Sequence, residues 1–245
     1  YVLGQDIDVT GGWEPIPNFG GHFDGQGFEI KGLYLDNGTV ERALRGCSAK
    51  LAQRYESVNG VYVGGFITTL AQTAVIQNVD FADVQIGQPD PRIQYIHRIE
   101  VPVEEGDPEE VRCYPLIGGL FGVIDGSDEA SATLENIRIR GLEAYVGGLF
   151  GGVAFDANFT TIRNVHLMKS EATGEVPSID IENTDASGFI VHAVRPTITS
   201  SSARVTISMS GGSIASPHVP AGVHADTALF IGYLIGGVLE RVAAK

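Results

Sequence analysis

Ile117-Gly118-Gly119-Leu120-Phe121-Gly122 and, after it, Leu134-Glu135-Asn136-Ile137 form a pair of phrases that the chain repeats. The first phrase recurs as Val63-Gly64-Gly65-Phe66 and as Val146-Gly147-Gly148-Leu149-Phe150-Gly151. The second phrase recurs as Ile76-Gln77-Asn78-Val79 and as Ile162-Arg163-Asn164-Val165. Self-similarity at a period of a few tens of residues is the sequence signature of a repeat architecture. Each unit reads as strand and turn, so the sequence predicts an all-β fold, a parallel β-helix or β-solenoid.

The repeats extend over most of the chain. Alternation of apolar and polar residues predicts half-buried strands before the first copy, as at Phe28 and Ile30. A degraded copy, Ser187-Gly188-Phe189-Ile190, follows the third, and a last echo lies at Leu229–Val238. A single all-β body of 245 residues is common. We therefore expect one domain over residues 1–245.

Two segments interrupt the repeats. Apolar residues recur at helical spacing within 39–56, which predicts a short amphipathic helix inserted between two strands, with Gly46 weakening the pattern. Apolar and polar residues alternate from Ile93 to Val103, between two prolines and an acidic run at 104–110. The segment 88–112 is therefore predicted to form a projecting β-arm that ends in a solvated acidic loop.

The Gly-Gly-Leu-Phe-Gly phrases followed by Ile-x-Asn-Val, or by the similar Leu134-Glu135-Asn136-Ile137, resemble the GLUG-repeat family of bacterial secreted and surface proteins. The opening block, with Trp13-Glu14-Pro15-Ile16 and Phe23-Asp24-Gly25, is similar to the segment that often precedes such repeats. The resemblance implies a right-handed parallel β-solenoid on an extracellular, adhesin-like chain. Some relatives carry a metallopeptidase domain, but this sequence has no His-Glu-x-x-His.

The repeated residues are expected to be structural. In a β-solenoid the apolar positions face inward and stack from rung to rung, and a mid-strand Asn can stack in the same way through amide hydrogen bonds. The predicted structural set is Gly64, Gly65, Gly118, Gly119, Gly147, Gly148, Asn78, Asn136 and Asn164. Ligand binding is the alternative role for the asparagines.

Composition narrows the partners. The chain has 30 acidic and 16 basic residues and a formal charge of −14. Nucleic acids and anionic membranes need a basic patch, so neither is an expected partner. No stretch is long and apolar enough for a membrane-spanning helix. The chain begins within a recognisable pattern at Tyr1, which suggests a mature or excised piece.

No motif predicts catalysis or a cofactor. The six histidines are scattered without ligand spacing, and no Gly-x-Ser-x-Gly elbow exists. Calcium is the one metal considered, with Asp6, Asp8 and Asp24 as weak candidates in the first block, although no calcium-loop motif is present. Turn-forming and solvated carboxylates are the favoured interpretation.

Cys47 and Cys113 leave two alternatives open: two unpaired thiols, or one disulfide that joins an insertion to the body. The expected function is a non-enzymatic extracellular structural module, either an adhesin-like stalk or a filament subunit that stacks end to end. Partners would then be other copies or neighbouring subunits, which contact the solenoid ends or the arm at 88–112. The alternative function is a β-helix that binds or cleaves carbohydrate.

Overall fold

Four sheets, almost wholly parallel, make up the structure. It is a computed structural model and describes residues 1–45, 47, 53–55, 58–89, 97–101, 109–146, 149–182, 186–210, 227–228 and 230–244. Every pairing between described strands is parallel except those of β6 with β7 and of β11 with β12. The predicted all-β fold built on parallel strands is therefore confirmed.

The strands are assigned to the sheets as follows. Sheet A runs in the order β1 (Ile7–Asp8), β4 (Glu29–Lys31), β9 (Val75–Ala82), β14 (Thr133–Arg140), β18 (Thr161–Met168), β22 (Thr197–Thr199) and β27 (Val238–Glu240), with β3 (His22–Asp24) beside β9 and β23 (Ser202–Ala203) beside β18 and β28 (Ala243–Ala244). Sheet B runs β2 (Ile16–Phe19), β8 (Ile67–Ala71), β13 (Phe121–Asp125), β17 (Ala154–Asn158), β21 (Ile190–Val194) and β26 (Ile231–Ile235). Sheet C runs β24 (Thr206–Ser210), β19 (Ser178–Glu182), β15 (Glu143–Val146), β10 (Gln85–Ile86) and β5 (Tyr34–Leu35). Sheet D runs β25 (Thr227–Ala228), β20 (Ala186–Ser187), β16 (Leu149–Gly151), β12 (Glu109–Gly118), β7 (Val58–Gly64) and β6 (Gln53–Tyr55), with β11 (His97–Val101) beside β12.

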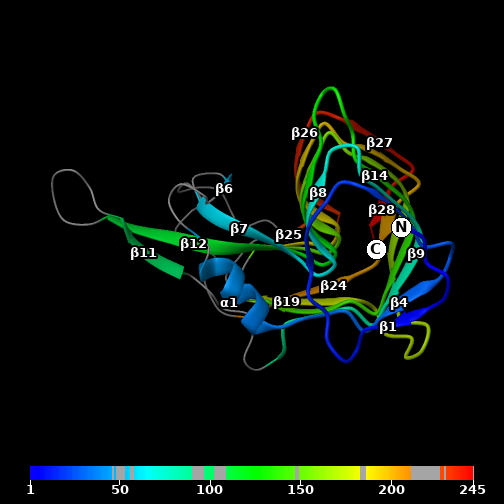
Figure 1. The fold of residues 1–245 in the computed structure, drawn as a ribbon, viewed down its shortest axis with the longest axis horizontal. Helices are drawn as coiled ribbons and strands as arrows, with labels where there is room; N and C mark the ends of the chain where they lie inside the picture. The colour runs from blue at the N-terminus through cyan, green and yellow to red at the C-terminus, as the bar shows by residue number, and fades with distance from the viewer. Residues whose placement is uncertain are drawn as a thin grey trace.

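The chain visits the sheets in a constant order. From β7 in sheet D it passes through β8, β9 and β10 in sheets B, A and C, and the next pass repeats this order with β12, β13, β14 and β15. Apart from β6 and β11, each described strand pairs with a counterpart one pass away, so that Ile137 lies between Val79 and Val165. Figure 1 shows these passes overlying one another around a common interior.

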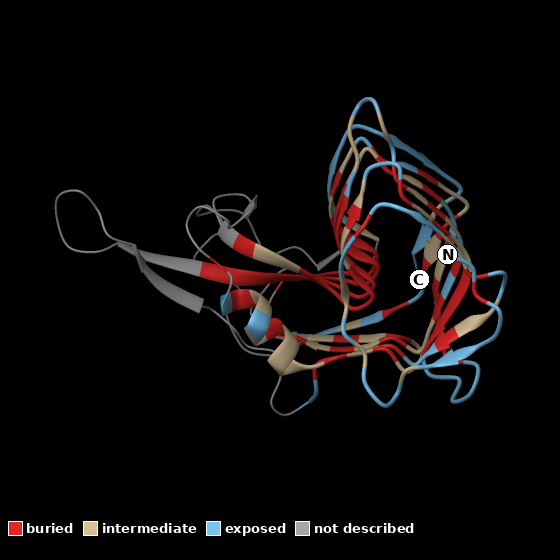
Figure 2. Cartoon of the chain, viewed as in Figure 1, coloured by how far each residue is buried: buried red, intermediate tan, exposed pale blue. Residues whose placement is uncertain are grey.

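Apolar side chains fill the interior that the four sheets surround. Phe66, Phe81, Phe121 and Phe189 are almost completely buried there, and Figure 2 shows buried residues along the stacked strands that surround this interior. Burying one such side chain contributes roughly 2 kcal/mol to stability. At the N-terminal end, Trp13 stacks on Phe66 with ring centroids 5.5 Å apart.

The repeated glycines lie where sheet D turns into sheet B. Gly118 pairs with Gly64 on one side and with Gly151 on the other. The phrase equivalent to Gly118-Gly119 is therefore Gly151-Gly152, not the predicted Gly147-Gly148, which falls outside the described residues. The prediction aligned the most similar residues, but the strand register places the equivalent of Gly118 four residues after Gly147, at Gly151. Ser187 occupies the same position on the next strand, beside Gly151.

The predicted helix exists but is shorter than 39–56. Helix α1 spans Asn37–Arg45, with Val40 and Leu44 buried one turn apart. Asp36 caps it, since its Oδ1 accepts a hydrogen bond from the backbone N–H of Thr39 at 2.6 Å. The helical spacing after Gly46 was misleading, because Gln53–Tyr55 forms strand β6. The helix packs at the side of the structure, against β7 and β12.

The predicted arm at 88–112 contains an antiparallel pair. Strand β11 (His97–Val101) pairs with the first half of β12, with His97 opposite Cys113. Figure 1 shows this pair projecting from the body. The predicted acidic loop lies outside the described residues except for Glu109 and Glu110, which belong to β12. No helix in the described part of the chain is long and apolar enough to cross a membrane.

Candidate functional site

A column of asparagines runs along the outer side of sheet A, with one residue on each of three neighbouring strands. Asn78, Asn136 and Asn164 have φ values of 53°, 54° and 52°, in the left-handed region that Asn tolerates better than most residues. Strand pairing skips these residues and resumes after them. Asn136 and Asn164 are exposed. The column therefore stacks as predicted for an Asn ladder, but on the surface and not among the inward-facing apolar residues.

Side-chain hydrogen bonds connect this column and extend it at both ends. Asn136 Nδ2 donates to Asn78 Oδ1 at 2.9 Å, and Asn164 Nδ2 donates to Asn136 Oδ1 at 2.8 Å. Asn78 Nδ2 donates to Asp24 Oδ1 at 3.2 Å. At the other end His166 bonds Asn164 Oδ1 through Nε2 at 2.7 Å and Ser202 Oγ through Nδ1 at 2.8 Å. We call Asp24, Asn78, Asn136, Asn164, His166 and Ser202 the polar column.

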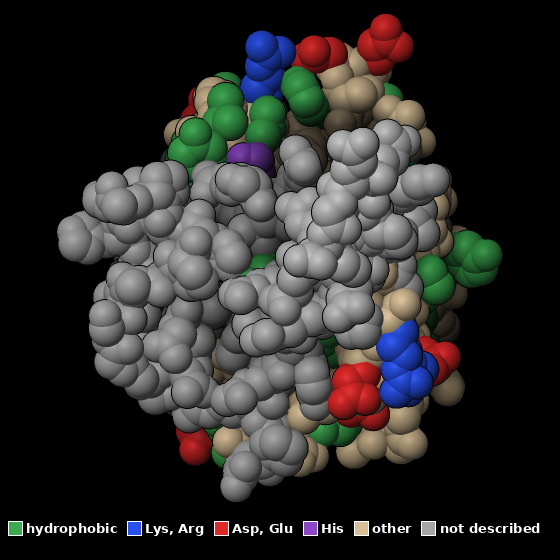
Figure 3. Space-filling model, turned by 90° about the vertical axis from the view of Figure 1, so that its left-hand side faces the viewer, with side chains coloured by type: hydrophobic (Ala, Val, Ile, Leu, Met, Phe, Trp, Pro, Cys, Tyr) green, Lys and Arg blue, Asp and Glu red, His purple; other side chains and the backbone are tan. Residues whose placement is uncertain are grey.

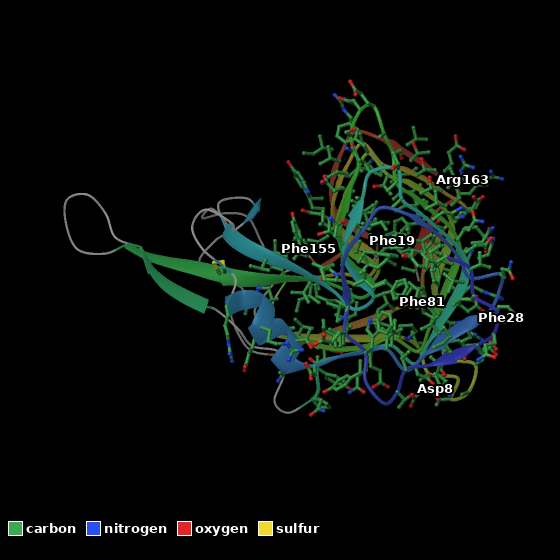
Figure 4. The ribbon with its side chains drawn as sticks, in the orientation of Figure 1. Asp8, Phe19, Phe28, Phe81, Phe155 and Arg163 are labelled. Atoms are coloured by element: carbon green, nitrogen blue, oxygen red, sulfur yellow. A yellow bond between two sulfur atoms is a disulfide. The ribbon has the colours of Figure 1, made fainter. Side chains whose placement is uncertain are left out.

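Charged residues form a network beside the polar column. Asp80, which is only 6% exposed, accepts from Arg138 Nε at 2.7 Å and pairs with Arg140 at 3.3 Å. Arg140 also pairs with Glu29 from the first pass and with Glu171 at 2.8 Å. Burial lowers the pKa of His166, and the nearby Arg138 cation lowers it further. Figure 4 shows Arg163 on this outer side and Phe81 inside.

The calcium candidates are engaged in local hydrogen bonds. Asp8 accepts from the Thr10 N–H at 2.9 Å, and Asp6 accepts from the Glu29 N–H at 2.9 Å. Asp24 accepts from the Gln26 N–H at 2.9 Å and from Gln77 Nε2 at 3.0 Å, besides Asn78. These bonds lower the pKa of Asp24, and the Thr10 hydroxyl and N–H lower that of Asp8. No group of three or more His, Cys, Asp or Glu that could hold a metal occurs among the described residues.

A second polar group lies where the outer faces of sheets D and B meet. Asp156 on β17, only 4% exposed, accepts a hydrogen bond from the Tyr62 hydroxyl and pairs with His192 Nδ1 at 3.2 Å. The His192 ring stacks on Tyr233 with centroids 5.3 Å apart. A small apolar cluster that includes Phe155 packs beside them, and Figure 4 places Phe155 at the junction with the arm.

Among described side chains on the arm side, acidic and basic groups lie next to each other (Figure 3).

A hollow of about 200 Å³ lies at the corner between sheets A and C. Its apolar floor includes Val84 and Leu142, and its polar lining includes Glu143 and Glu175. The wall at 170–176 is held by its own hydrogen bonds, such as Ser170 N to Glu175 O at 2.8 Å. Burial raises the pKa of Tyr145, and Glu143, Asp180 and Glu175 raise it further, so these carboxylates lie near the phenol.

Cys47 and Cys113 form a disulfide with their Cα atoms 6.5 Å apart. It connects the segment after α1 to β12, at the base of the arm. Of the two alternatives that the sequence left open, the structure contains the bond between an insertion and the body. Both cysteines are buried, Cys113 completely.

The sequence did not indicate the partners at the ends of the polar column or around Asp156. His166 and His192 read as scattered histidines, because Ser202, which bonds His166, and Asp156, which pairs with His192, each lie one pass away in the chain. Only the strand register, which pairs His166 with Ser202 and Asp156 with His192, could have brought them together. Comparison of the chain with protein-family models, with curated proteins and with solved structures gave no match.

Proposed function

We propose that the chain is a non-catalytic β-solenoid module of an extracellular, adhesin-like protein, as its resemblance to the GLUG-repeat family implies. The observation that carries the proposal is the constant order in which successive passes visit the four sheets. Stacked passes of this kind contact mainly their neighbours and build an extended, rigid body. The polar column adds to this interpretation, because its side chains bond one another from pass to pass.

The disulfide supports an extracellular location. Disulfides persist in oxidising compartments and are rare in reducing ones. The bond between Cys47 and Cys113 joins residues 66 apart and ties the base of the arm to the helical insertion. If the protein is produced in the periplasm of a bacterial host and then unfolded, thiol titration should find no free thiol. Two free thiols per chain would count against this location.

The module could act as a stalk or assemble into a filament, and its two ends differ in ways that bear on this choice. At the C-terminal end, five large apolar residues on β26 and β27 are exposed: Tyr233, Leu234, Ile235, Val238 and Leu239. At the other end β2 is the edge strand of sheet B, and its Ile16 N–H donates to the backbone oxygen of Phe66 in the next pass. The following residue, Pro17, stands where an N–H would point away from the sheet toward an added strand, and proline has no N–H. A filament contact would therefore join the β26–β27 end of one copy to the β2 end of the next. The backbone hydrogen bonding at β2 would be incomplete because of Pro17.

Electron microscopy and light scattering at high protein concentration distinguish these versions. Filaments that disappear in Leu234→Glu and persist in Glu135→Gln, a change on the outer side of sheet A, would establish the filament. Uniform monomers would remove the filament and leave the stalk. A compact body without a repeating rung spacing of about 4.8 Å would contradict the solenoid itself.

Carbohydrate binding is the second candidate function, and the hollow between sheets A and C favours it. The carboxylates of Asp83, Glu143 and Glu175 line the hollow together with the apolar side chains of Val84 and Leu142. Such a lining suits the hydroxyl groups of a neutral sugar and repels anionic glycans. Neutral oligosaccharides should bind, and Glu143→Gln should weaken binding about tenfold while Glu135→Gln does not. Equal binding by both variants, or none by the parent protein, would reject this candidate.

A further inference from the structure

The polar column has a direction, because one of its ends is an acceptor. Asp24 Oδ1 accepts from the Gln26 N–H and also from Asn78 Nδ2. An ionised carboxylate has no hydrogen to donate. Asn78 must therefore present its NH₂ group to Asp24, which leaves the Asn78 carbonyl oxygen for the next side chain along the column.

Each later residue of the polar column is constrained in the same way. Asn136 meets the Asn78 oxygen and must donate through Nδ2, so its own oxygen is left for Asn164. Asn164 in turn presents Oδ1 to His166, so the hydrogen of the imidazole must be on Nε2. His166 Nδ1 then accepts from the Ser202 hydroxyl. All the hydrogen bonds from Ser202 to Asp24 point the same way.

Without Asp24, the hydrogen bonds of the polar column could point in either direction. Carboxamides, a neutral imidazole and a hydroxyl each contain a donor and an acceptor, so the column could be reversed by flipping every group. The reversed column would put a hydrogen on His166 Nδ1 and would turn the Asn78 oxygen toward the Asp24 carboxylate. Two acceptors would then face each other, which is unfavourable.

From this geometry we infer that Asp24 is a positioning residue that sets the direction of the whole column and thereby the Nε2–H tautomer of His166. The two residues are linked through three asparagines on β9, β14 and β18. The effect requires a neutral imidazole. The groups that face His166 are Arg138, on the neighbouring strand and itself paired with Asp80, together with Asn164 and Ser202.

The test is ¹⁵N NMR of the histidine rings at a pH about one unit above the ordinary His pKa of ~6.5. The unmodified protein should show His166 as the Nε2–H form alone. Asp24→Ala removes the acceptor, so the Nδ1–H form should become detectable. Asp24→Asn keeps an oxygen that can accept from Gln26 and Asn78, so it should preserve the Nε2–H form.

Two further variants separate this effect from local or structural causes. Asn136→Ala interrupts the column and should produce the same change as Asp24→Ala, and adding Asp24→Ala to it should change nothing more. Asp8→Ala removes a first-block carboxylate outside the column and should leave His166 unchanged. The same His166 spectrum in the parent, Asp24→Ala and Asn136→Ala proteins, with folding verified by amide spectra, would overturn the inference. This result would not bear on the solenoid or filament proposals.

Discussion

Gly119 and Gly152 lie so close across neighbouring passes that a Cβ on Gly119 would be 2.2 Å from the backbone oxygen of Gly152. Neither residue has a positive φ, so close approach and not backbone conformation requires glycine there. Gly119→Ala should destabilise the protein by about 3 kcal/mol, because backbone atoms must move apart. The matched control is Gly11→Ala, where a Cβ meets nothing within 4 Å. Urea unfolding midpoints measure both changes, and equal stability of the two variants would refute this packing.

Asn136 has two roles that substitutions can separate. Asn136→Gly keeps the left-handed conformation but removes two hydrogen bonds of the column, which should cost about 1–2 kcal/mol. Asn136→Ala removes the same bonds and adds about 1 kcal/mol of backbone strain. The ranking by thermal unfolding should be parent, Gly, then Ala. Ala at least as stable as Gly would show that the gap in strand pairing at this position does not need the left-handed conformation.

The disulfide between Cys47 and Cys113 closes a long loop. With a separation of 66 residues, the chain-entropy relation predicts a loss of about 4 kcal/mol when the bond is removed. Replacement of both cysteines by serine should lower the unfolding midpoint accordingly, and reductant should lower the midpoint of the parent protein but not that of the variant. A reductant effect on the double variant would show that this bond is not the cause.

Asp24 should make the stability of the folded protein depend on pH in the acidic range. The Gln26 N–H lowers its pKa first, followed by Gln77 and Asn78. A lowered folded-state pKa stabilises the protein above the ordinary value of ~3.9, and this contribution is lost as the pH falls through the folded-state pKa. The stability gap between the parent and Asp24→Ala should therefore narrow below pH ~4. Denaturation at several pH values measures the gap, and a constant gap would contradict this assignment.

His166 should titrate below its ordinary pKa. Burial and then Arg138 lower that pKa, so the neutral ring stabilises the fold above ~6.5, and this contribution is lost as the pH falls through the folded-state value. NMR titration of the ring carbons should show a depressed pKa. Arg138→Ala should raise it only in part, because burial remains. A ring that titrates at the ordinary value in the parent protein would contradict this environment.

The sequence predicted the class of fold because the repeats directly encode the stacked strands. It also predicted the inserted helix and the arm, because the periodicity changes at both interruptions. The register was harder to predict, as Gly147-Gly148 shows. A five-residue match outweighed the requirement that residues such as Phe121 and Ala154 occupy paired positions in sheet B.

The candidate site was less predictable for a related reason. Asn78, Asn136 and Asn164 stand out because they recur in the sequence, whereas Asp24, His166 and Ser202 do not recur. Their contacts depend on which residues the register brings together across passes. The pairing of buried Asp156 with half-buried His192 arises in the same way.

Successive passes stack in parallel, with each strand against its counterpart one pass away. Nuclear Overhauser contacts between backbone protons test this stacking most directly. Parallel stacking predicts contacts of the residues around Ile137 with those around Val79 and Val165, all in parallel register. Contacts that instead joined β13 to β14, or β17 to β18, as antiparallel hairpins would contradict it.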